Sequence, residues 1–392
     1  MKYNFDEIIE RKGTDCIKWD YIGERFGKED IVPMWVADMD FKAPPAVVDA
    51  LVERAAHGIY GYTGKTDQFF DSIVRWNERR FGWKTKKEWY TGTPGVVPAL
   101  IFSILAFSHP GDEIIVQTPV YYPFFNAIEK NGRKIVENPL IYENGKYLMD
   151  FEDLKKKISK RTRIIILCSP HNPVGRVWKK EELQKFGELC LENGILIISD
   201  EIHCDLVYGE NRHIPFANIS KEFSDNSITL MAPSKTFNIA GLHTSVSVIP
   251  NEEIRNKFEI VLENLGLFGN SLFGIEAFRV AYNEGEEWLE QLKEYVYDNY
   301  IHLKDFLKNE TPLLKVTELE GTYLSWIDCQ ELNMTDEQLD DFFLYKVKVG
   351  LNAGPIFGKN GSGFQRINLA CPKSTLNKML ENLKNVYTEI TS

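Results

Sequence analysis

The sequence has no closely spaced cysteine pair and no hydrophobic run long enough to cross a membrane. Its six cysteines are scattered over 392 residues without a C-x-x-C motif. We therefore expect free structural thiols in a reducing compartment, and neither disulfides nor a metal site. The longest apolar stretch, residues 96–107, is shorter than the roughly 20 residues that a membrane-spanning helix requires.

Positively charged residues are outnumbered by acidic ones, 46 to 57. The net charge is −11 at pH 7, which argues against a protein that binds nucleic acid or an anionic membrane surface. Residues 1–13 are polar and mixed in charge, unlike a signal or transit peptide. We expect a cytoplasmic protein, and internal repeats are absent.

The length predicts two domains, each with its own core. In the middle of the chain helical and strand patterns alternate, which is typical of an α/β fold with a mostly parallel sheet between helices. After residue 285 a long charged helix begins and the pattern changes to mixed α+β. We predict a large domain over residues 44–285 and a smaller one formed by residues 1–43 and 286–392. Strands are expected near residues 113–117, 163–168, 195–199, 229–231 and 244–249, and a glycine turn followed by a helix over residues 92–107.

Three polar residues follow the ends of predicted parallel strands. Asn172, Asp200 and Lys235 each come after an apolar strand, and ligands on such sheets bind at the carboxyl ends of the strands. The neighbours of Lys235 are apolar or carry hydroxyl groups, which suits a partly desolvated amine that can form a Schiff base. Taken alone, Asp200 could be a helix cap or a turn residue at the end of a strand, and Asn172 could be a turn residue. Their occurrence together predicts one site.

Four segments carry a resemblance to a known family. They are residues 33–41 (PMWVADMDF), 199–203 (SDEIH), 234–238 (SKTFN) and 366–368 (RIN). With these segments the chain resembles pyridoxal-phosphate enzymes of the aspartate-aminotransferase fold (fold type I, aminotransferase class I/II). Within that group it is similar to the MalY/PatB-type cystathionine β-lyases, also called cysteine-S-conjugate β-lyases. The resemblance covers nearly the whole chain and implies pyridoxal 5'-phosphate as the cofactor.

The resemblance implies a role for each residue that should hold the cofactor ring. Lys235 would carry the cofactor as a Schiff base and then remove the substrate's α-proton. Asp200 would bind the protonated pyridine nitrogen, which keeps the ring an electron sink. Asn172 would donate to the phenolate oxygen, and Tyr121 would stack on the ring face.

The phosphate and the substrate have expected partners too. Ser234 and the backbone amides of Gly95, Val96 and Val97, at the start of a helix, would bind the cofactor phosphate. Tyr62 would reach the phosphate of a neighbouring subunit, which predicts a homodimer.

For the substrate, Arg366 would form a fork on the α-carboxylate, with Asn172 and Ala37 beside it. Tyr122 or Lys235 would protonate the leaving sulfur.

Two positions depart from the pattern of typical aminotransferases of this fold. His203 stands three residues after the ring-binding aspartate, where those enzymes have a tyrosine. The lyase branch shares this departure, which supports the resemblance to that branch, and we expect His203 among the cofactor-binding residues. His243 stands eight residues after the lysine, where an arginine usually helps to hold the phosphate, so the usual contact is missing there.

Three functions are compatible with these residues. The first is β-elimination on an L-cysteine S-conjugate such as L-cystathionine, which gives a thiol, pyruvate and ammonia. The second is an aminotransferase that acts on an L-amino acid and a 2-oxo acid, because the two reactions share their first steps. The third is a protein-binding regulator that keeps the cofactor as a structural element. The resemblance to the lyase branch and His203 favour the first.

Overall fold

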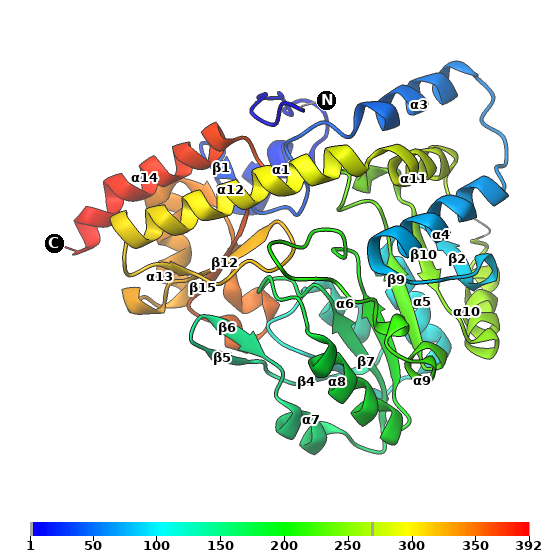
Figure 1. Cartoon of the computed structure of the whole chain (residues 1–392). Coiled ribbons are helices and arrows are strands. Elements are labelled where there is room, and N and C mark those ends of the chain that lie inside the picture. Colours follow the sequence, from blue (N-terminus) through cyan, green and yellow to red (C-terminus); the bar gives the residue numbers. More distant parts are fainter. Residues whose placement is uncertain (1–2, 268–269, 392) are drawn as a thin grey trace.

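The computed structural model describes residues 3–267 and 270–391. Its centre is a seven-stranded sheet in the order β2-β10-β9-β8-β7-β3-β4 (Figure 1). β10 is antiparallel to both of its neighbours, and the remaining pairs are parallel. The strands are β2 (Tyr90–Thr93), β3 (Glu113–Val116), β4 (Lys134–Glu137), β7 (Thr162–Cys168), β8 (Leu196–Asp200), β9 (Ser227–Met231) and β10 (Ser245–Val248). The predicted α/β fold with a mostly parallel sheet is confirmed.

Alternate residues of the parallel strands point to opposite faces of the sheet, and both faces are covered by helices. Ile164 packs in one apolar cluster with Leu100 of α5, while its neighbour Ile165 packs in another with Phe186 of α8. The helices around this sheet are α5 (Val96–Phe107), α6 (Pro123–Glu129), α7 (Phe151–Lys157), α8 (Lys180–Glu192), α9 (Lys221–Asp225) and α10 (Glu252–Asn264).

Gly92, the first residue of the segment expected to contain a glycine turn, lies inside strand β2. Glycine normally weakens a strand, but here it makes room for a close neighbour. A Cβ atom on Gly92 would lie 2.0 Å from Oδ1 of Asn270. The expected glycine turn falls at Gly95, directly before α5.

A second, four-stranded sheet has the order β11-β12-β15-β14. Its strands are β11 (Lys315–Val316), β12 (Leu324–Asp328), β14 (Asn352–Ala353) and β15 (Phe364–Asn368), and two further pairs are β1 (Val32–Pro33) with β13 (Val349–Gly350) and β5 (Ile141–Glu143) with β6 (Lys146–Leu148). In Figure 1 the long helix α12 (Glu286–Glu310) runs beside α14 (Lys373–Thr391) over this sheet. The other helices are α1 (Ile17–Asp20), α2 (Ile22–Phe26), α3 (Pro45–Ala56), α4 (Asp67–Phe81), α11 (Leu272–Glu284) and α13 (Asp336–Asp341).

One apolar cluster continues across the predicted domain boundaries. It contains Phe5 near the N-terminus, Trp76 of α4, Phe237 beside the first sheet, Leu292 of α12 and Ile367 of β15. The division at residues 44 and 285 therefore stays a prediction. Among the described residues, no helix combines the length and the apolar composition needed to cross a bilayer.

Candidate active site

A cavity of about 380 Å³ lies beyond the carboxyl ends of β7, β8 and β9. This is the edge of the sheet where the sequence predicts a ligand. The cavity is lined by Ala37, Pro94, Gly95, Val96, Val97, Pro98, Tyr121, Cys168, Asn172, Asp200, Ile202, His203, Ser234, Lys235, Ala240 and His243. It therefore brings together most of the residues expected from the sequence.

The parallel register explains why the three diagnostic residues meet. Cys168 at the end of β7 pairs with Asp200 at the end of β8, and Asp200 pairs with Leu230 of β9. The loops that leave β7 and β9 then deliver Asn172 and Lys235 to the same edge. Residues far apart in the sequence thus meet because neighbouring strands end at the same level.

Lys235 points across the cavity to the N-terminal part of the chain. Its Nζ atom donates a hydrogen bond of 2.6 Å to the carbonyl oxygen of Ala37. Desolvation lowers the pKa of Lys235 to about 8, while the carboxylate of Asp38 opposes this shift and the guanidinium of Arg366 adds to it. About a tenth of the amine is therefore unprotonated at pH 7, far more than for an ordinary lysine, which favours a role as nucleophile or base.

Asp200 is a buried carboxyl group with few partners. It is 4% exposed, and the hydrogen bond that its side chain makes within the described chain comes from the N–H of Ile202, at 3.1 Å. Burial raises the pKa of Asp200 to about 7, and the nearby Glu201 raises it further, against an opposing effect of Lys235. A carboxyl group in this state would gain much from a cationic N–H donor in the cavity.

Arg366 borders the cavity from the second sheet without lining it. Its Nη1 atom donates to Oδ1 of Asn172 (3.1 Å), and its Nη2 atom donates to Oδ1 of Asn352 (2.6 Å) and to the carbonyl of Trp35 (2.7 Å). Burial lowers the pKa of Arg366 to about 10, so the guanidinium stays charged at neutral pH. These partners are neutral oxygens, and none of the described carboxylates forms an ion pair with it, which suits an anionic substrate group.

His203 and the neighbouring aromatic residues form another wall. Burial, together with the positive charges of Lys235 and Arg366, lowers the pKa of His203 to about 3. Its ring is therefore neutral, and its Nδ1 atom is buried without a hydrogen-bond partner in the described chain. Burial raises the pKa of Tyr121 above its ordinary value, so this phenol stays protonated.

The start of helix α5 forms an anion-binding end of the cavity. Gly95 precedes the helix with φ +155°, a conformation that side chains disfavour. The free N–H groups of a helix N-terminus favour a negatively charged group. Ser234 lines the same cavity, and so does His243, which adopts a left-handed conformation with φ +49°.

Besides Arg366, two further expected residues lie outside the cavity lining. Tyr122 is next to it, with its ring 5.6 Å from the ring of Tyr121. Tyr62 lies on the surface and is fully exposed, so this chain does not bring it to its own cavity.

Sequence reasoning missed Tyr323 and Asn352. The buried Tyr323 donates to the carbonyl of Ala37 (2.9 Å), and its ring lies 5.8 Å from that of His203. Asn352 holds Arg366 from the adjacent strand. The turn at residues 321–322 is the one signal near Tyr323, and no pattern marks Asn352.

Comparison with known proteins places the chain in a family. Residues 29–383 match the family model "Aminotransferase class I and II". The chain is similar to "Cystathionine beta-lyase PatB" from Bacillus subtilis (strain 168), with 46% identity over 97% of this chain and 99% of that protein. It is also similar to "Protein MalY" from Escherichia coli (strain K12), with 33% identity over 99% of this chain and 100% of that protein.

A solved structure has the same fold. Cystalysin from Treponema denticola, which contains a pyridoxal 5'-phosphate cofactor, superimposes with a TM-score of 0.96 and 38% identity, covering 99% of this chain and 100% of that chain. The match of the family model extends over most of the sequence, and the chain therefore belongs to the aminotransferase class I and II family.

Proposed function

We propose that this chain is a pyridoxal-5'-phosphate-dependent carbon–sulfur β-lyase. It cleaves L-cystathionine or a related L-cysteine S-conjugate to a thiol, pyruvate and ammonia. The proposal rests on the cavity that Lys235 and Asp200 line and that Arg366 borders, in a chain that is 46% identical to a cystathionine β-lyase.

The residues present fit pyridoxal phosphate. The buried carboxyl group of Asp200 lacks a cationic partner, and a protonated pyridine nitrogen would supply one. Asn172 faces Arg366 with its oxygen, which leaves its amide nitrogen to donate to a ring oxygen. The start of α5 and Ser234 would hold the phosphate, Tyr121 would cover the ring face, and the unpartnered Nδ1 of His203 is a further contact.

Few side chains take part in the proposed reaction. Bound pyridoxal phosphate supplies an electron sink for the pair left on the substrate's α-carbon. Arg366 binds the α-carboxylate and turns the α-C–H bond toward Lys235. The lowered pKa of Lys235 increases the fraction of neutral amine, which is the form that takes this proton.

The carbon–sulfur bond then breaks, and its electron pair leaves with the sulfur. The sulfur needs one proton, which Lys235 carries from the first step. Tyr122 is the other candidate donor, because it lies beside Tyr121 at the cavity. Water completes the reaction, so that conjugate and water give thiol, pyruvate and ammonium.

The test uses purified, cofactor-loaded protein with L-cystathionine and no 2-oxo acid. Repeated turnover with equal amounts of pyruvate and free thiol, lost in Lys235→Ala, is the expected result. The family model favours an aminotransferase as the second candidate. A single turnover that resumes only after a 2-oxo acid is added would establish that alternative and overturn the lyase proposal.

We also propose that the chain forms a homodimer in which Tyr62 completes the site of the partner subunit. Exposed apolar side chains along α3 and the following loop, namely Val48, Val52, Ile59, Tyr60 and Tyr62, support an interface there. In an equal mixture of the inactive variants Tyr62→Ala and Lys235→Ala, heterodimers should restore about a quarter of the sites. No recovery after subunit exchange would contradict the shared site.

We also propose that the chain has two domains and is located in the cytoplasm. The separate sheets support a large domain over residues 44–285 and a small domain over residues 1–43 and 286–392. Five buried free cysteines and a half-buried one support the reducing cytoplasm as its location.

A further inference from the structure

Residues 35–41 form a strap along one side of the cavity, held by its backbone carbonyls. The Nη2 atom of Arg366 donates to the carbonyl of Trp35 (2.7 Å). The side chain of Asn368, two residues further on, donates to the carbonyls of Val36 (2.6 Å) and Asp38 (2.6 Å). Strand β15 therefore fixes the strap from the side of the second sheet.

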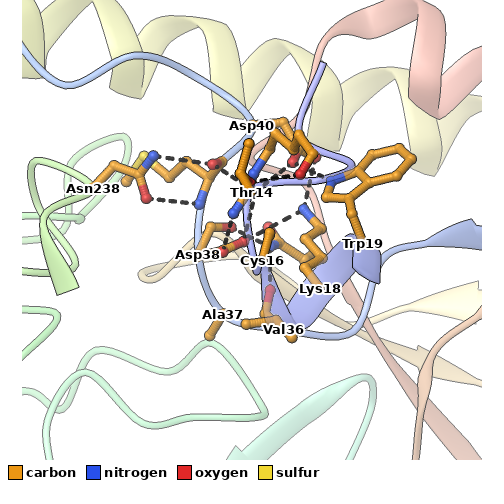
Figure 2. A network of polar contacts seen from close by, with 12 residues as sticks. Thr14, Cys16, Lys18, Trp19, Val36, Ala37, Asp38, Asp40 and Asn238 are labelled. Atoms are coloured by element: carbon orange, nitrogen blue, oxygen red, sulfur yellow. Dashed lines mark hydrogen bonds and ion pairs between the residues drawn. The ribbon is translucent and has the colours of Figure 1, made fainter. Parts of the chain in front are cut away.

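The loop that carries Lys235 fixes the strap from the other side. The side chain of Asn238 accepts from the N–H of Met39 (3.0 Å) and donates to the carbonyls of Met39 (3.0 Å) and Phe41 (2.8 Å). Figure 2 shows Asn238 approaching the strap from the side opposite Lys18 and Trp19. Between these anchors, the carbonyl of Ala37 accepts from Lys235.

The strap is also anchored by an ionic cluster, defined here as Arg11, Lys18, Asp38 and Asp40. Arg11 pairs with Asp38 (2.5 Å) and Asp40 (2.6 Å). The ammonium of Lys18 lies 2.7 Å from Asp40 and 3.7 Å from Asp38, and the indole of Trp19 donates to Asp40 (3.0 Å). Figure 2 shows Lys18 pointing at both carboxylates.

Two of the four charges of this cluster are shielded from water. Lys18 is 1% exposed and Asp40 5% exposed, and the cluster contains two cations and two anions. Buried ion pairs contribute little net stability compared with an apolar core, but they require one specific geometry. A cluster of this kind is suited to fixing the position of the short strap between its anchors.

We propose that Asp38 is a positioning residue for Lys235. Held by Arg11 and Lys18, Asp38 keeps the adjacent carbonyl of Ala37 against the amine and places a carboxylate beside it. This rests on the proposed function of Lys235 and adds a residue that acts on Lys235 from outside the cavity lining.

The charges around Lys235 make the proposal measurable. Asp38 and Asp200 favour its protonated form, and Arg366 opposes it. The ring of His203 is neutral, and burial holds the pKa of Tyr323 far above its ordinary value, so these two carry no charge near neutral pH. Removal of the Asp38 carboxylate should therefore lower the pH at which Lys235 loses its proton.

The test compares Asp38→Asn with the wild type and with Asp30→Asn as a matched control. Asp30 lies in the same N-terminal region but pairs with Lys348, away from the strap. The visible absorbance of cofactor-loaded protein is titrated with pH, which reports protonation at the Lys235 nitrogen. For Asp38→Asn the midpoint should fall by about half a unit or more, for Asp30→Asn it should not move, and Asp38→Glu should restore it.

A second readout needs neither catalysis nor cofactor. Brief reductive methylation of cofactor-free protein at several pH values, followed by peptide mass spectrometry, gives the pH at which Lys235 becomes reactive. The same downward shift is expected for Asp38→Asn. Because this readout works even if the protein cleaves no carbon–sulfur bond, failure of the proposed function is distinguishable from failure of this inference.

Unchanged midpoints in Asp38→Asn by both readouts would overturn the inference. If Asp38→Asn does not fold, Lys18→Gln replaces it. That substitution removes a cation facing Asp38, so the midpoint of the Lys235 titration should rise. If the substitutions only loosened the strap, the midpoints of Lys18→Gln and Asp38→Asn would shift in the same direction. A midpoint that stays or falls in Lys18→Gln would likewise overturn the inference.

Discussion

Asp200 in the cavity and Asp40 in the ionic cluster are almost equally buried, with 4% and 5% of their surfaces exposed. Their pKa values nevertheless move in opposite directions. Burial raises the pKa of Asp200 to about 7. The pKa of Asp40 is lowered, because the desolvation that would raise it is outweighed by Lys18, Trp19 and Arg11.

The two pKa values differ because the two carboxylates have different hydrogen-bond and ionic partners, and not because they are buried to different extents. Asp40 has two cations and an indole N–H within hydrogen-bond distance, whereas Asp200 receives one backbone N–H. A buried charge with complete partners organises structure, and a buried charge without them is available to a ligand. The five predictions that follow test this comparison.

The largest effect is expected for Asp200→Asn. Loss of the carboxylate should reduce kcat for L-cystathionine by about 10³-fold, because an amide cannot stabilise a protonated pyridine nitrogen. Stability at neutral pH should not fall, since the variant removes a poorly partnered charge. Pyruvate release and thermal unfolding measure the two effects. A variant that is destabilised but fully active would contradict the comparison.

The pH dependence of stability should have opposite signs at the two aspartates. The pKa of Asp200 is raised from 3.8 to about 7. Its stabilising contribution to the free energy of unfolding is therefore complete below pH 3.8 and is lost as the pH rises through 7. In cofactor-free protein this loss is on the order of a few kcal/mol, and Asp200→Asn should abolish it. The pKa of Asp40 is lowered from 3.8, so its contribution is present above that pH and lost in acid. Urea unfolding of the wild type and of the two Asp→Asn variants at several pH values measures both contributions. If both contributions changed in the same direction with pH, the contrast between the two aspartates would be wrong.

Asp40→Asn should destabilise the fold by about 3 kcal/mol, because it leaves the buried Lys18 without its closest carboxylate. The midpoint of urea unfolding measures this change. Asp20→Asn provides a control in the same region, where Asp20 caps an exposed loop. Equal midpoints for the two variants would show that the ionic cluster does not hold the fold.

Arg366→Lys tests the cation of the cavity. An ammonium cannot form the fork that binds a carboxylate, so KM for L-cystathionine should rise by about 10- to 30-fold. A smaller decrease in kcat should accompany it, because Lys235 and Asp200 remain in place. Steady-state kinetics over a range of substrate concentrations separates the two constants. An unchanged KM would remove Arg366 from substrate binding.

The smallest effect is expected for the exposed pair between Glu7 and Lys42, which are 2.7 Å apart with about half of each side chain in water. Glu7→Gln should change the free energy of unfolding by less than about 0.5 kcal/mol. A loss similar to that of Asp40→Asn would mean that burial is not what distinguishes the ionic cluster.

The sequence predicted the strands and cavity residues that local patterns mark. The apolar strands before Asn172, Asp200 and Lys235 are found as β7, β8 and β9. It missed β2, because a strand containing Gly92 lacks the usual pattern and forms through contact with a distant residue. The sequence did not predict that Tyr323 belongs to the site, because its hydrogen-bond partner Ala37 is far away along the chain.

The sequence did not predict the ionic cluster, although Asp38 and Asp40 lie in the segment 33–41 that carries the family resemblance. Arg11, Lys18, Asp38 and Asp40 are common charged residues, and composition predicts that such residues stay in water. Their burial follows from packing of the N-terminal segment against the second sheet and the Lys235 loop.

By itself the sequence determined the α/β class, the strands that precede Asn172, Asp200 and Lys235, and the residue types of the site, because these depend on hydrophobic period and local motifs. Only the tertiary structure decided that the cavity and the ionic cluster share the strap of residues 35–41. Hydrogen bonds and ion pairs between distant segments depend on where the chain places them, and charge state in turn depends on which partners burial leaves within reach.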